Sequence, residues 1–376
     1  MTKPSPAADA AAASVVTNPV PVAADLPDAS AAADAAPQYS QSRGWVALLA
    51  RLNISVAFTS YQSGLLYMLG RNAAGAHLHQ TGIIKPMGLA RDGEGGLTLS
   101  AGFQILRFAN PLKAEQRVND LFDACYVPRT IHVTGELDAH DVGIAADGSI
   151  VFVSTRFNCL ATVDPSDSFK KLWLPPFISE LVDEDRCHLN GLAMQDGKPA
   201  YVSAVSRSNT VDGWRDRRSD GGVVIDVNSN QIVCTGLSMP HSPRVHNGEL
   251  WVLNSGTGDL GVIEGAASGT GAFVPKAFCP GFLRGLSFHG DLAFVGLSKP
   301  RYQRFEGLAL DQRLRDADSE PWCGVQVIDT KTGACVEWFR IDGNISELYD
   351  VEVLPDVICP MALSPNSAEI FKFITV

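Results

Sequence analysis

Six short segments of the chain share one pattern, in which an apolar strand is followed by a turn and a second strand. The segments are KPMGLA (85–90), HDVGIA (140–145), HLNGLA (188–193), HSPRVH (241–246), FLRGLS (282–287) and ELYDVE (347–352). Hairpins that recur at a period of roughly 40–55 residues are typical of β-propeller blades. The sequence therefore predicts an all-β, six-bladed propeller in which these segments are the innermost strands.

The turns and the chain ends support this prediction. The dipeptides Asp147-Gly148, Asn247-Gly248 and His289-Gly290 are typical of tight hairpin turns. The hairpin at 54–70 lacks an opening strand of its own, and the segment at 347–352 has too little sequence after it to complete a blade. We expect the two to share one blade, because closing the ring removes exposed sheet edges.

Residues 1–42 differ in composition from the rest of the chain. They are mostly Ala, Pro, Ser and Asp, cannot bury a core, and are predicted to be disordered. The propeller is assigned to residues 43–376. The N-terminal segment does not read as a signal peptide, and the eight cysteines are scattered without a C-x-x-C pair. We therefore predict free thiols and a cytoplasmic location.

Charge and hydropathy exclude several classes of partner. The net charge is −11 and no basic block is present, so nucleic acid is not an expected partner. No apolar run approaches the roughly 20 residues that a membrane span requires. The sequence also contains no G-x-S-x-G elbow, glycine-rich phosphate loop or dinucleotide fingerprint.

The first residues of the six aligned strands would converge on the propeller axis. They are Lys85, His140, His188, His241, Phe282 and Glu347. Imidazole and carboxylate groups are ligands for divalent transition metals, and three protein ligands with open positions are typical of a catalytic site. We predict a mononuclear metal, Fe or Zn, bound by His140, His188 and His241. The alternative is that each histidine is simply hydrogen-bonded at the mouth of a strand.

Other polar residues near these positions complete the predicted site. Glu347 would be a fourth ligand or a general base, or it would form a salt bridge with Lys85. Asp141 follows His140 directly, and Asn190 lies two residues after His188; Arg284 and Tyr349 have the corresponding position in their own strands. Such groups can orient imidazoles. We assign Glu347, Arg284, Tyr349 and Asp141 to catalysis, and Lys85 and Asn190 to substrate binding. A turn cap for Asp141 and a structural ion pair for Arg284 are the alternatives.

Several loops should return to the same face as the histidines. Arg156, Lys299 and Arg301 lie in such loops and are assigned to substrate binding, with an anionic group as their expected target. Two long polar inserts, 206–222 and 298–324, should shape a pocket or a lid, and residues 305–317 within the second have helical spacing. Solvated arginines and a docking surface for a protein partner are the alternatives for these loops.

Long motifs of this chain resemble an uncharacterised bacterial family of conserved hypothetical proteins, which are sometimes fused to tetratricopeptide repeats. The motifs are RCHLNGLAM, GLSMPHSPR, LWVLNSGTG, PGFLRGLSFHG and FVGLSKPR, and the resemblance spans roughly residues 44–360. The family has no established activity, so the resemblance implies the propeller fold and not a reaction.

Two functions of different classes follow from these observations. The first is a metal-dependent enzyme that acts on a small substrate by oxygenase or by hydrolase or lyase chemistry. The second is a non-catalytic binding module for a small ligand or a partner protein. A closed pocket above the histidines would favour the enzyme, and an open, flat face would favour the binding module.

Overall fold

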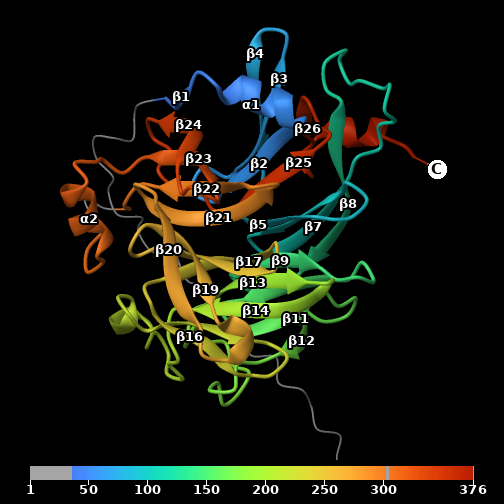
Figure 1. Ribbon diagram of the computed structural model, residues 1–376. Coiled ribbons are helices and arrows are strands. Elements are labelled where there is room, and N and C mark those ends of the chain that lie inside the picture. Colours follow the sequence, from blue (N-terminus) through green and yellow to red (C-terminus); the bar gives the residue numbers. More distant parts are fainter. Residues whose placement is uncertain (1–35, 302–304, 376) are drawn as a thin grey trace, which may run out of the picture.

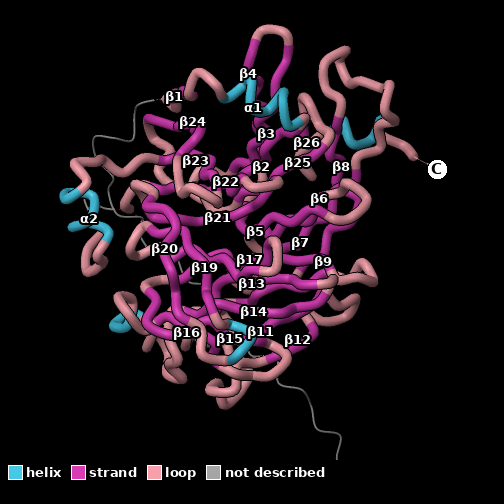
Figure 2. The backbone as a smooth tube through the Cα atoms, in the orientation of Figure 1, coloured by secondary structure: helices cyan, strands magenta, loops and turns pink. Residues whose placement is uncertain are grey.

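The protein is a six-bladed β-propeller, as the sequence predicts, with each blade a separate antiparallel sheet around a common axis (Figures 1 and 2). The structure, a computed structural model, describes residues 36–301 and 305–375. The six predicted opening segments all provide innermost strands. We number the blades 1–6 in the chain order of those strands.

The first three blades follow one another along the chain. Blade 1 contains β5 (Pro86–Arg91), β6 (Leu97–Ala101), β7 (Gln104–Ala109) and β8 (Ala124–Val133), with β26 (Pro360–Ala362) added parallel to β8 at its outer edge. Blade 2 contains β9 (Ala139–Ile144), β10 (Ile150–Ser154), β11 (Cys159–Thr162) and β12 (Lys170–Trp173). Blade 3 contains β13 (Leu189–Gln195), β14 (Lys198–Ala204), β15 (Gly222–Asp226) and β16 (Ile232–Leu237).

Blades 4 and 5 continue the ring. Blade 4 contains β17 (Pro240–His246), β18 (Glu249–Asn254), β19 (Asp259–Glu264) and β20 (Ala272–Phe278). Blade 5 contains β21 (Phe282–His289), β22 (Leu292–Ser298), β23 (Cys323–Asp329) and β24 (Cys335–Asp342), with β1 (Gln38–Gln41) paired to β24. The predicted turn between β17 and β18 forms at Asn247 and Gly248, whose φ angles of 51° and 79° suit a two-residue hairpin loop.

Blade 6 closes the ring with strands from both ends of the chain, as predicted. Its inner strand β25 (Val351–Pro355) pairs with β2 (Ile54–Ser60), which is followed by β3 (Leu65–Asn72) and β4 (Gly75–Gly82). Figure 1 shows the red β25 beside the blue β2. Closure of this kind leaves no unpaired inner strand at the point where the ring meets.

The described part of the predicted disordered segment includes an ordered strand. Residues 1–35 lie outside the described residues, but Gln38–Gln41 pair with Phe339–Asp342 at the edge of blade 5. The ordered chain therefore begins before residue 43, where the sequence placed the boundary. The eight cysteines are free, and only Cys335 is exposed.

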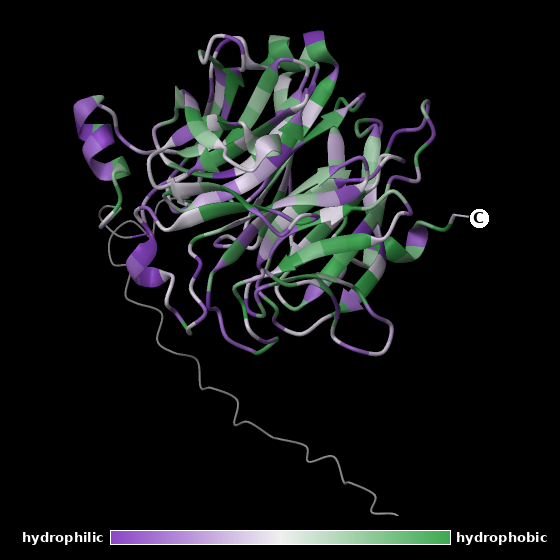
Figure 3. Cartoon of the chain, turned by 60° about the horizontal axis from the view of Figure 1, so that its bottom comes forward, coloured by the Kyte–Doolittle hydropathy of each residue, from purple (hydrophilic) through white to green (hydrophobic). Residues whose placement is uncertain are grey.

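Apolar residues fill the spaces between neighbouring blades. Helix α1 (Trp45–Leu52) adds Trp45 and Leu49, both fully buried, to the cluster between blades 5 and 6. Figure 3 shows hydrophobic colours concentrated along the strands, whereas many connecting loops are hydrophilic. Helix α2 (Leu310–Asp316) lies within the segment of predicted helical spacing, and short 3₁₀ turns occupy Arg215–Arg217, Ala266–Ser268 and Ala368–Lys372. No helix within the described ranges is long and apolar enough to cross a membrane.

Candidate functional site

Buried polar side chains meet on the propeller axis at the mouths of the inner strands. The rings of His140 and His188 lie 5.0 Å apart between centroids, and the ring of Tyr349 lies 5.6 Å from that of His140. The guanidinium of Arg284 lies 5.5 Å from the centre of the Tyr349 ring and forms an ion pair with Glu347. The structure therefore brings His140, His188, Tyr349, Arg284 and Glu347 into one group.

The histidines do not share one register, however, which corrects the alignment made from the sequence. Ala139 of β9 and Leu189 of β13 each pair with the last residue of the next strand and begin a β-bulge. His140 follows Ala139, whereas His188 precedes Leu189, so the two histidines lie on successive levels. His140 is level with Asn190. Both strands contain the same bulge, since Val142 and Leu192 each pair two residues before the partners of Ala139 and Leu189. The alignment of Gly143 with Gly191 was therefore out of register by two residues.

Each histidine is held through its Nδ1 atom. Nδ1 of His140 contacts the backbone oxygen of Asp138 at 2.8 Å, and Nδ1 of His241 contacts that of Met239 at 2.7 Å. Carbonyl oxygens only accept, so in both rings Nδ1 carries the proton and Nε2 presents a lone pair. Burial lowers the pKa of His140 to about 4 and that of His241 well below its usual value, so both rings are neutral at pH 7.

His188 forms a dyad with Asp185. Its Nδ1 lies 2.6 Å from Oδ2 of Asp185, and the other oxygen of this carboxylate accepts the backbone N–H of His188 at 2.9 Å. Asp185 thereby fixes the orientation of the ring and would stabilise its protonated form. The sequence analysis missed Asp185, although its position three residues before His188 was a usable signal.

The metal prediction finds no support in the arrangement of ligands. Within residues 36–301 and 305–375, no group of three or more His, Cys, Asp or Glu side chains is arranged to hold a metal ion. His140 and His188 are neighbours, but a third donor does not join them in that geometry. The described residues therefore show no preformed metal site, and binding of Fe or Zn stays a prediction.

Glu347 is the centre of an ion-pair cluster at the edge of the site. Its Oε2 accepts hydrogen bonds from Arg284 Nη1 at 3.1 Å and from Arg301 Nε at 3.0 Å, and it also accepts the Tyr61 hydroxyl proton. Burial raises the pKa of Glu347, but the charges of Arg284 and Arg301 outweigh this effect and hold the pKa below its usual value. Glu347 is therefore ionised and does not pair with Lys85.

Within residues 36–301 and 305–375, four buried polar atoms near the axial histidines have no hydrogen-bond partner in the protein. They are Asn190 Nδ2, Trp214 Nε1, Arg284 Nε and Tyr349 Oη. Asn190, Trp214 and Tyr349 are 3%, 7% and 7% exposed, and desolvation by burial raises the pKa of Tyr349 well above its usual value. All four atoms can donate a hydrogen bond, and unpaired buried donors cost folding free energy unless a ligand or water satisfies them.

The two long inserts cover this region, as the sequence predicts. Trp214, from the insert 206–222, lies over His188 with 4.2 Å between ring centroids. Phe305, from the insert 298–324, packs at 6.1 Å from Phe282. Both inserts contribute to one apolar cluster, so they cover the axis together. The predicted closed pocket stays a prediction, because residues 302–304 of the second insert lie outside the described residues.

Three residues assigned to substrate binding form ion pairs on the surrounding loops. Lys85 contacts Glu136 at 3.1 Å and Asp138 at 3.7 Å. Arg156 forms a bidentate pair with Asp183, and Lys299 lies 3.6 Å from Asp342. The alternative of ordinary loop ion pairs therefore describes the observed contacts, and substrate binding by these residues stays a prediction.

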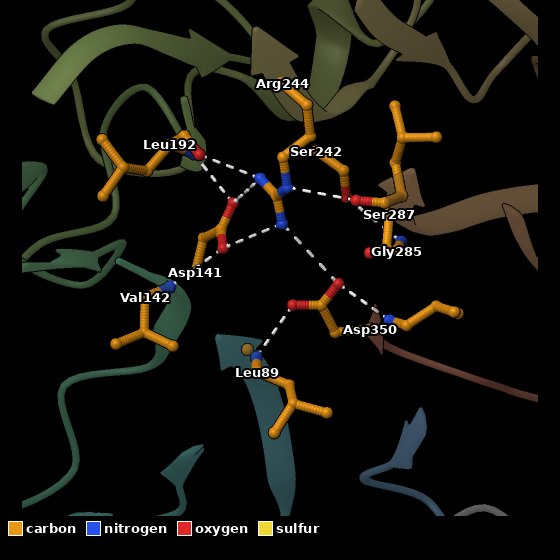
Figure 4. A network of polar contacts seen from close by, with 12 residues as sticks. Leu89, Asp141, Val142, Leu192, Ser242, Arg244, Gly285, Ser287 and Asp350 are labelled. Carbon is orange, nitrogen blue, oxygen red and sulfur yellow. Dashed lines mark hydrogen bonds and ion pairs between the residues drawn. The ribbon is translucent and has the colours of Figure 1, made fainter. Parts of the chain in front are cut away.

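Asp141 belongs to a separate network next to the histidine level (Figure 4). Both of its carboxylate oxygens accept hydrogen bonds, from the backbone N–H groups of Val142 and Leu192 and from the guanidinium of Arg244. Arg244 Nη2 also lies 3.7 Å from Oδ1 of Asp350. These contacts give Asp141 a structural role, and its assignment to catalysis stays a prediction.

The network contacts the inner strands of all six blades. Arg244 of blade 4 donates to the backbone oxygens of Leu192 in blade 3 and Leu286 in blade 5. Asp350, at the start of blade 6, accepts the backbone N–H of Leu89 in blade 1 at 2.8 Å. The sequence signal for this network was present, because Arg244 and Asp350 interrupt the small-residue position of the repeat.

The fold and site define a six-bladed propeller with a covered polar site on its axis. The chain belongs to a family defined as a domain of unknown function (DUF4915), which matches residues 43–363. This finding confirms the resemblance to an uncharacterised family. No curated protein matches the chain.

Solved structures share the fold at low sequence identity. A chain of a nidogen/laminin complex is 10% identical, with 81% of this chain and 99% of that chain covered and a TM-score of 0.50. Inactive virginiamycin B lyase from Staphylococcus aureus, solved with quinupristin, is 13% identical over 65% of this chain and 73% of its own, with a TM-score of 0.39. A protein of unknown function from Bacteroides caccae is 9% identical over 80% and 98%, with a TM-score of 0.46. At this identity the nidogen/laminin comparison speaks to the fold alone, and the other two similarities, with TM-scores below 0.5, carry no argument.

Proposed function

We propose that the axial site binds a small ligand through a hydrogen-bond-accepting group, a carboxylate or a carbonyl, and that His188 accepts a proton from that ligand. The observation that carries the proposal is the cluster of four buried donors without a partner: Asn190 Nδ2, Trp214 Nε1, Arg284 Nε and Tyr349 Oη. A ligand oxygen would satisfy donors that otherwise destabilise the fold.

The charges at the site favour a ligand with a negative group. Two guanidinium groups, Arg284 and Arg301, share the single carboxylate of Glu347. Lys85 is already paired with Glu136 and Asp138, and Asp185 is engaged by His188. The excess positive charge therefore lies only beside Glu347, whereas carboxylates outnumber cations around Lys85 and His188, so a negative group of the ligand would bind next to Arg284 and Arg301.

Proton transfer is assigned to His188 because of its dyad with Asp185. In the direction of proton abstraction, an O–H or C–H bond of the ligand breaks, its proton moves to Nε2 of His188, and its electron pair stays on the ligand. The ring becomes positively charged, and the Asp185 carboxylate 2.6 Å away stabilises that charge. His140 and His241 present neutral Nε2 atoms, which can accept hydrogen bonds from hydroxyl groups of the ligand.

Ligand binding can be tested by isothermal titration calorimetry with acetate, lactate and phenylacetate as probes. Tyr349→Phe removes one unpartnered buried hydroxyl at the axis, and we expect it to weaken binding by about tenfold or more. Thr98→Val is the matched control, because the Thr98 hydroxyl is also buried and unpartnered but lies on β6. Equal affinities of the two variants for every probe would argue against the axial site.

One further variant distinguishes an enzyme from a binding module. Asp185→Asn keeps the size of the side chain but removes the charge that stabilises protonated His188. In an enzyme this variant should lower turnover by at least tenfold while ligand affinity changes little. If no proton exchange or turnover of any bound probe is detected with the wild type, the site is a binding module.

A metal-dependent enzyme is the second candidate, and one observation favours it. All three histidines use Nδ1 for a hydrogen bond to a carbonyl or carboxylate oxygen, which leaves Nε2 free, as in histidines that bind metals. Inductively coupled plasma mass spectrometry of untagged protein, with and without reconstitution by Fe(II) or Zn(II), tests this. About one equivalent that is lost in His188→Gln would support the metal; no metal in any sample would exclude it.

A further inference from the structure

The roof of the axial site is apolar, in contrast to its floor. We call the apolar roof the residues of one hydrophobic cluster: Val205, Trp214, Met239, Phe282, Phe305, Leu310 and Leu314. The cluster combines side chains from both inserts with the ends of inner strands. Each of its residues is less than a tenth exposed.

The polar floor lies directly against this roof. We call the polar floor the residues His140, His188, Asn190, His241, Arg284 and Tyr349. Trp214 lies 4.2 Å from His188, and Phe282 lies 5.3 Å from His241, between ring centroids. The Arg284 guanidinium also lies 5.1 Å from the centre of the Phe282 ring. A ligand held by the floor would therefore have the apolar roof against its other side.

Charged groups of the inserts face away from the interior of the roof. Arg215 stacks on Trp214 at 4.6 Å and bonds to Asp212, and both residues are more than half exposed. Arg313 bonds to Asp259 and lies over Phe278 at 4.7 Å. Arg215 and Arg313 thus have partners outside the roof, whereas Arg301 of the second insert pairs with Glu347 beside the polar floor. The roof itself consists of aromatic and aliphatic groups.

We propose that the ligand of the axial site is an amphipathic carboxylic acid, with its carboxylate on the polar floor and an aromatic or branched aliphatic group against the apolar roof. This inference rests on the proposed function, which supplies the carboxylate position beside Arg284 and Tyr349. Burial of apolar surface adds affinity in proportion to the area removed from water. A small polar acid would leave the roof without a partner.

Phe305 has a specific role in the apolar roof. It packs on Phe282, which in turn contacts both His241 and Arg284, so Phe305 supports the surface that the apolar group would touch. The backbone N–H of Phe305 donates to Asp311 Oδ1 at 2.8 Å, which ties this residue to helix α2. Replacing Phe305 by a smaller side chain should therefore reduce the contribution of the apolar group without altering the floor.

Calorimetric titration with acetate, butyrate, hexanoate and phenylacetate tests the proposal in the full chain. We expect the affinity to rise by up to about fourfold per added methylene group. Phe305→Leu should flatten this rise while the affinity for acetate is retained, and Phe305→Ala should flatten it further. Phe371→Ala is the control, because Phe371 is 83% exposed in the C-terminal 3₁₀ turn. Circular dichroism confirms that each variant is folded.

The outcomes separate this inference from the proposed function. An affinity that is the same for every acid and is weakened by Tyr349→Phe would overturn the amphipathic ligand and leave the axial site intact. An affinity that rises with chain length but is unchanged in Phe305→Leu would also overturn it, because the apolar group would then bind elsewhere. If no acid binds to the wild-type protein, the proposed function fails and the inference fails with it.

Discussion

Arg244 donates a hydrogen bond from Nη1 to Oδ2 of Asp141 at 2.8 Å and so joins blade 4 to blade 2 across the propeller axis (Figure 4). The side chains are only 20% and 5% exposed. Burial lowers the pKa of Arg244, but the charges of Asp141 and Asp350 outweigh it and keep the guanidinium protonated. One buried cation therefore holds two carboxylates and the backbone of neighbouring blades.

We expect Arg244→Met to lower the free energy of unfolding by about 3–5 kcal/mol, because the substitution leaves the buried Asp141 carboxylate without its cation. Urea denaturation followed by circular dichroism measures the change. The triple variant Arg244→Met, Asp141→Asn, Asp350→Asn removes the charges together and should recover part of the loss. A single variant as stable as the wild type would show that the network does not stabilise the propeller.

Asp350 should give the stability a characteristic pH dependence. Burial raises its pKa from 3.8 to about 8, although the charge of Arg244 opposes this shift. The folded state therefore holds a proton that the unfolded state has already lost between about pH 4 and 8. The free energy of unfolding contributed by this group falls as the pH rises through that window and is constant above it.

The clearest interval for this test is about pH 7 to 8, above the usual pKa of histidine and above the raised pKa of Glu352, about 7. Wild-type protein should lose up to about 1 kcal/mol per pH unit there through Asp350. Asp350→Asn should show a flatter profile over the same interval. Parallel profiles for the two proteins would mean that Asp350 is ionised throughout.

The shared blade makes the C-terminal strand essential for closing the ring. A chain that ends at residue 346 lacks β25 and leaves the buried strand β2 without its inner partner. We expect this truncation to abolish cooperative unfolding. A chain that ends at residue 363 keeps β25 and β26 and should unfold cooperatively. If both truncated proteins unfold like the wild type, the closure does not contribute to stability.

The histidine tautomers can be checked directly. His140 and His241 bond through Nδ1 to carbonyl oxygens, so nitrogen NMR at pH 7 should show protonated Nδ1 and unprotonated Nε2 in both. His246 provides the internal control, because its Nε2 contacts the backbone oxygen of Gly290 at 2.8 Å and should carry the proton. Doubly protonated rings for His140 and His241 at pH 7 would contradict their lowered pKa values.

The fold could be predicted from the sequence to a large extent because its signals are local and repeated. Period-2 apolar strands, Asn-Gly and Asp-Gly turns and the small-residue position mark each inner hairpin. The hairpin at 54–70 and the strand at 347–352 each lacked a partner, which identified the closed blade. The pairing of β1 with β24 was not predictable, because the four residues of β1 carry no apolar pattern and are mostly exposed.

The site was predictable only in part. The repeat predicted that His140, His188 and Glu347 lie at the axis, because inner strands converge there in any propeller. It could not show that the equivalent positions of β9 and β13 differ by two residues from the glycine alignment, which puts His140 and His188 on different levels. It also could not show that Asp141 pairs with Arg244. The two residues are far apart in the sequence, and only the folded chain determines which carboxylate lies within reach of a buried arginine.

The central claim is that the unpartnered donors on the axis bind a ligand. A crystal structure of the protein with phenylacetate, at a resolution that shows ordered water, tests it most directly. We predict density for a carboxylate within hydrogen-bond distance of Tyr349 Oη and Arg284 Nε, with the ring of the ligand against Phe282. Density in which water molecules alone satisfy Asn190, Arg284 and Tyr349, with phenylacetate absent at saturating concentration, would contradict the account.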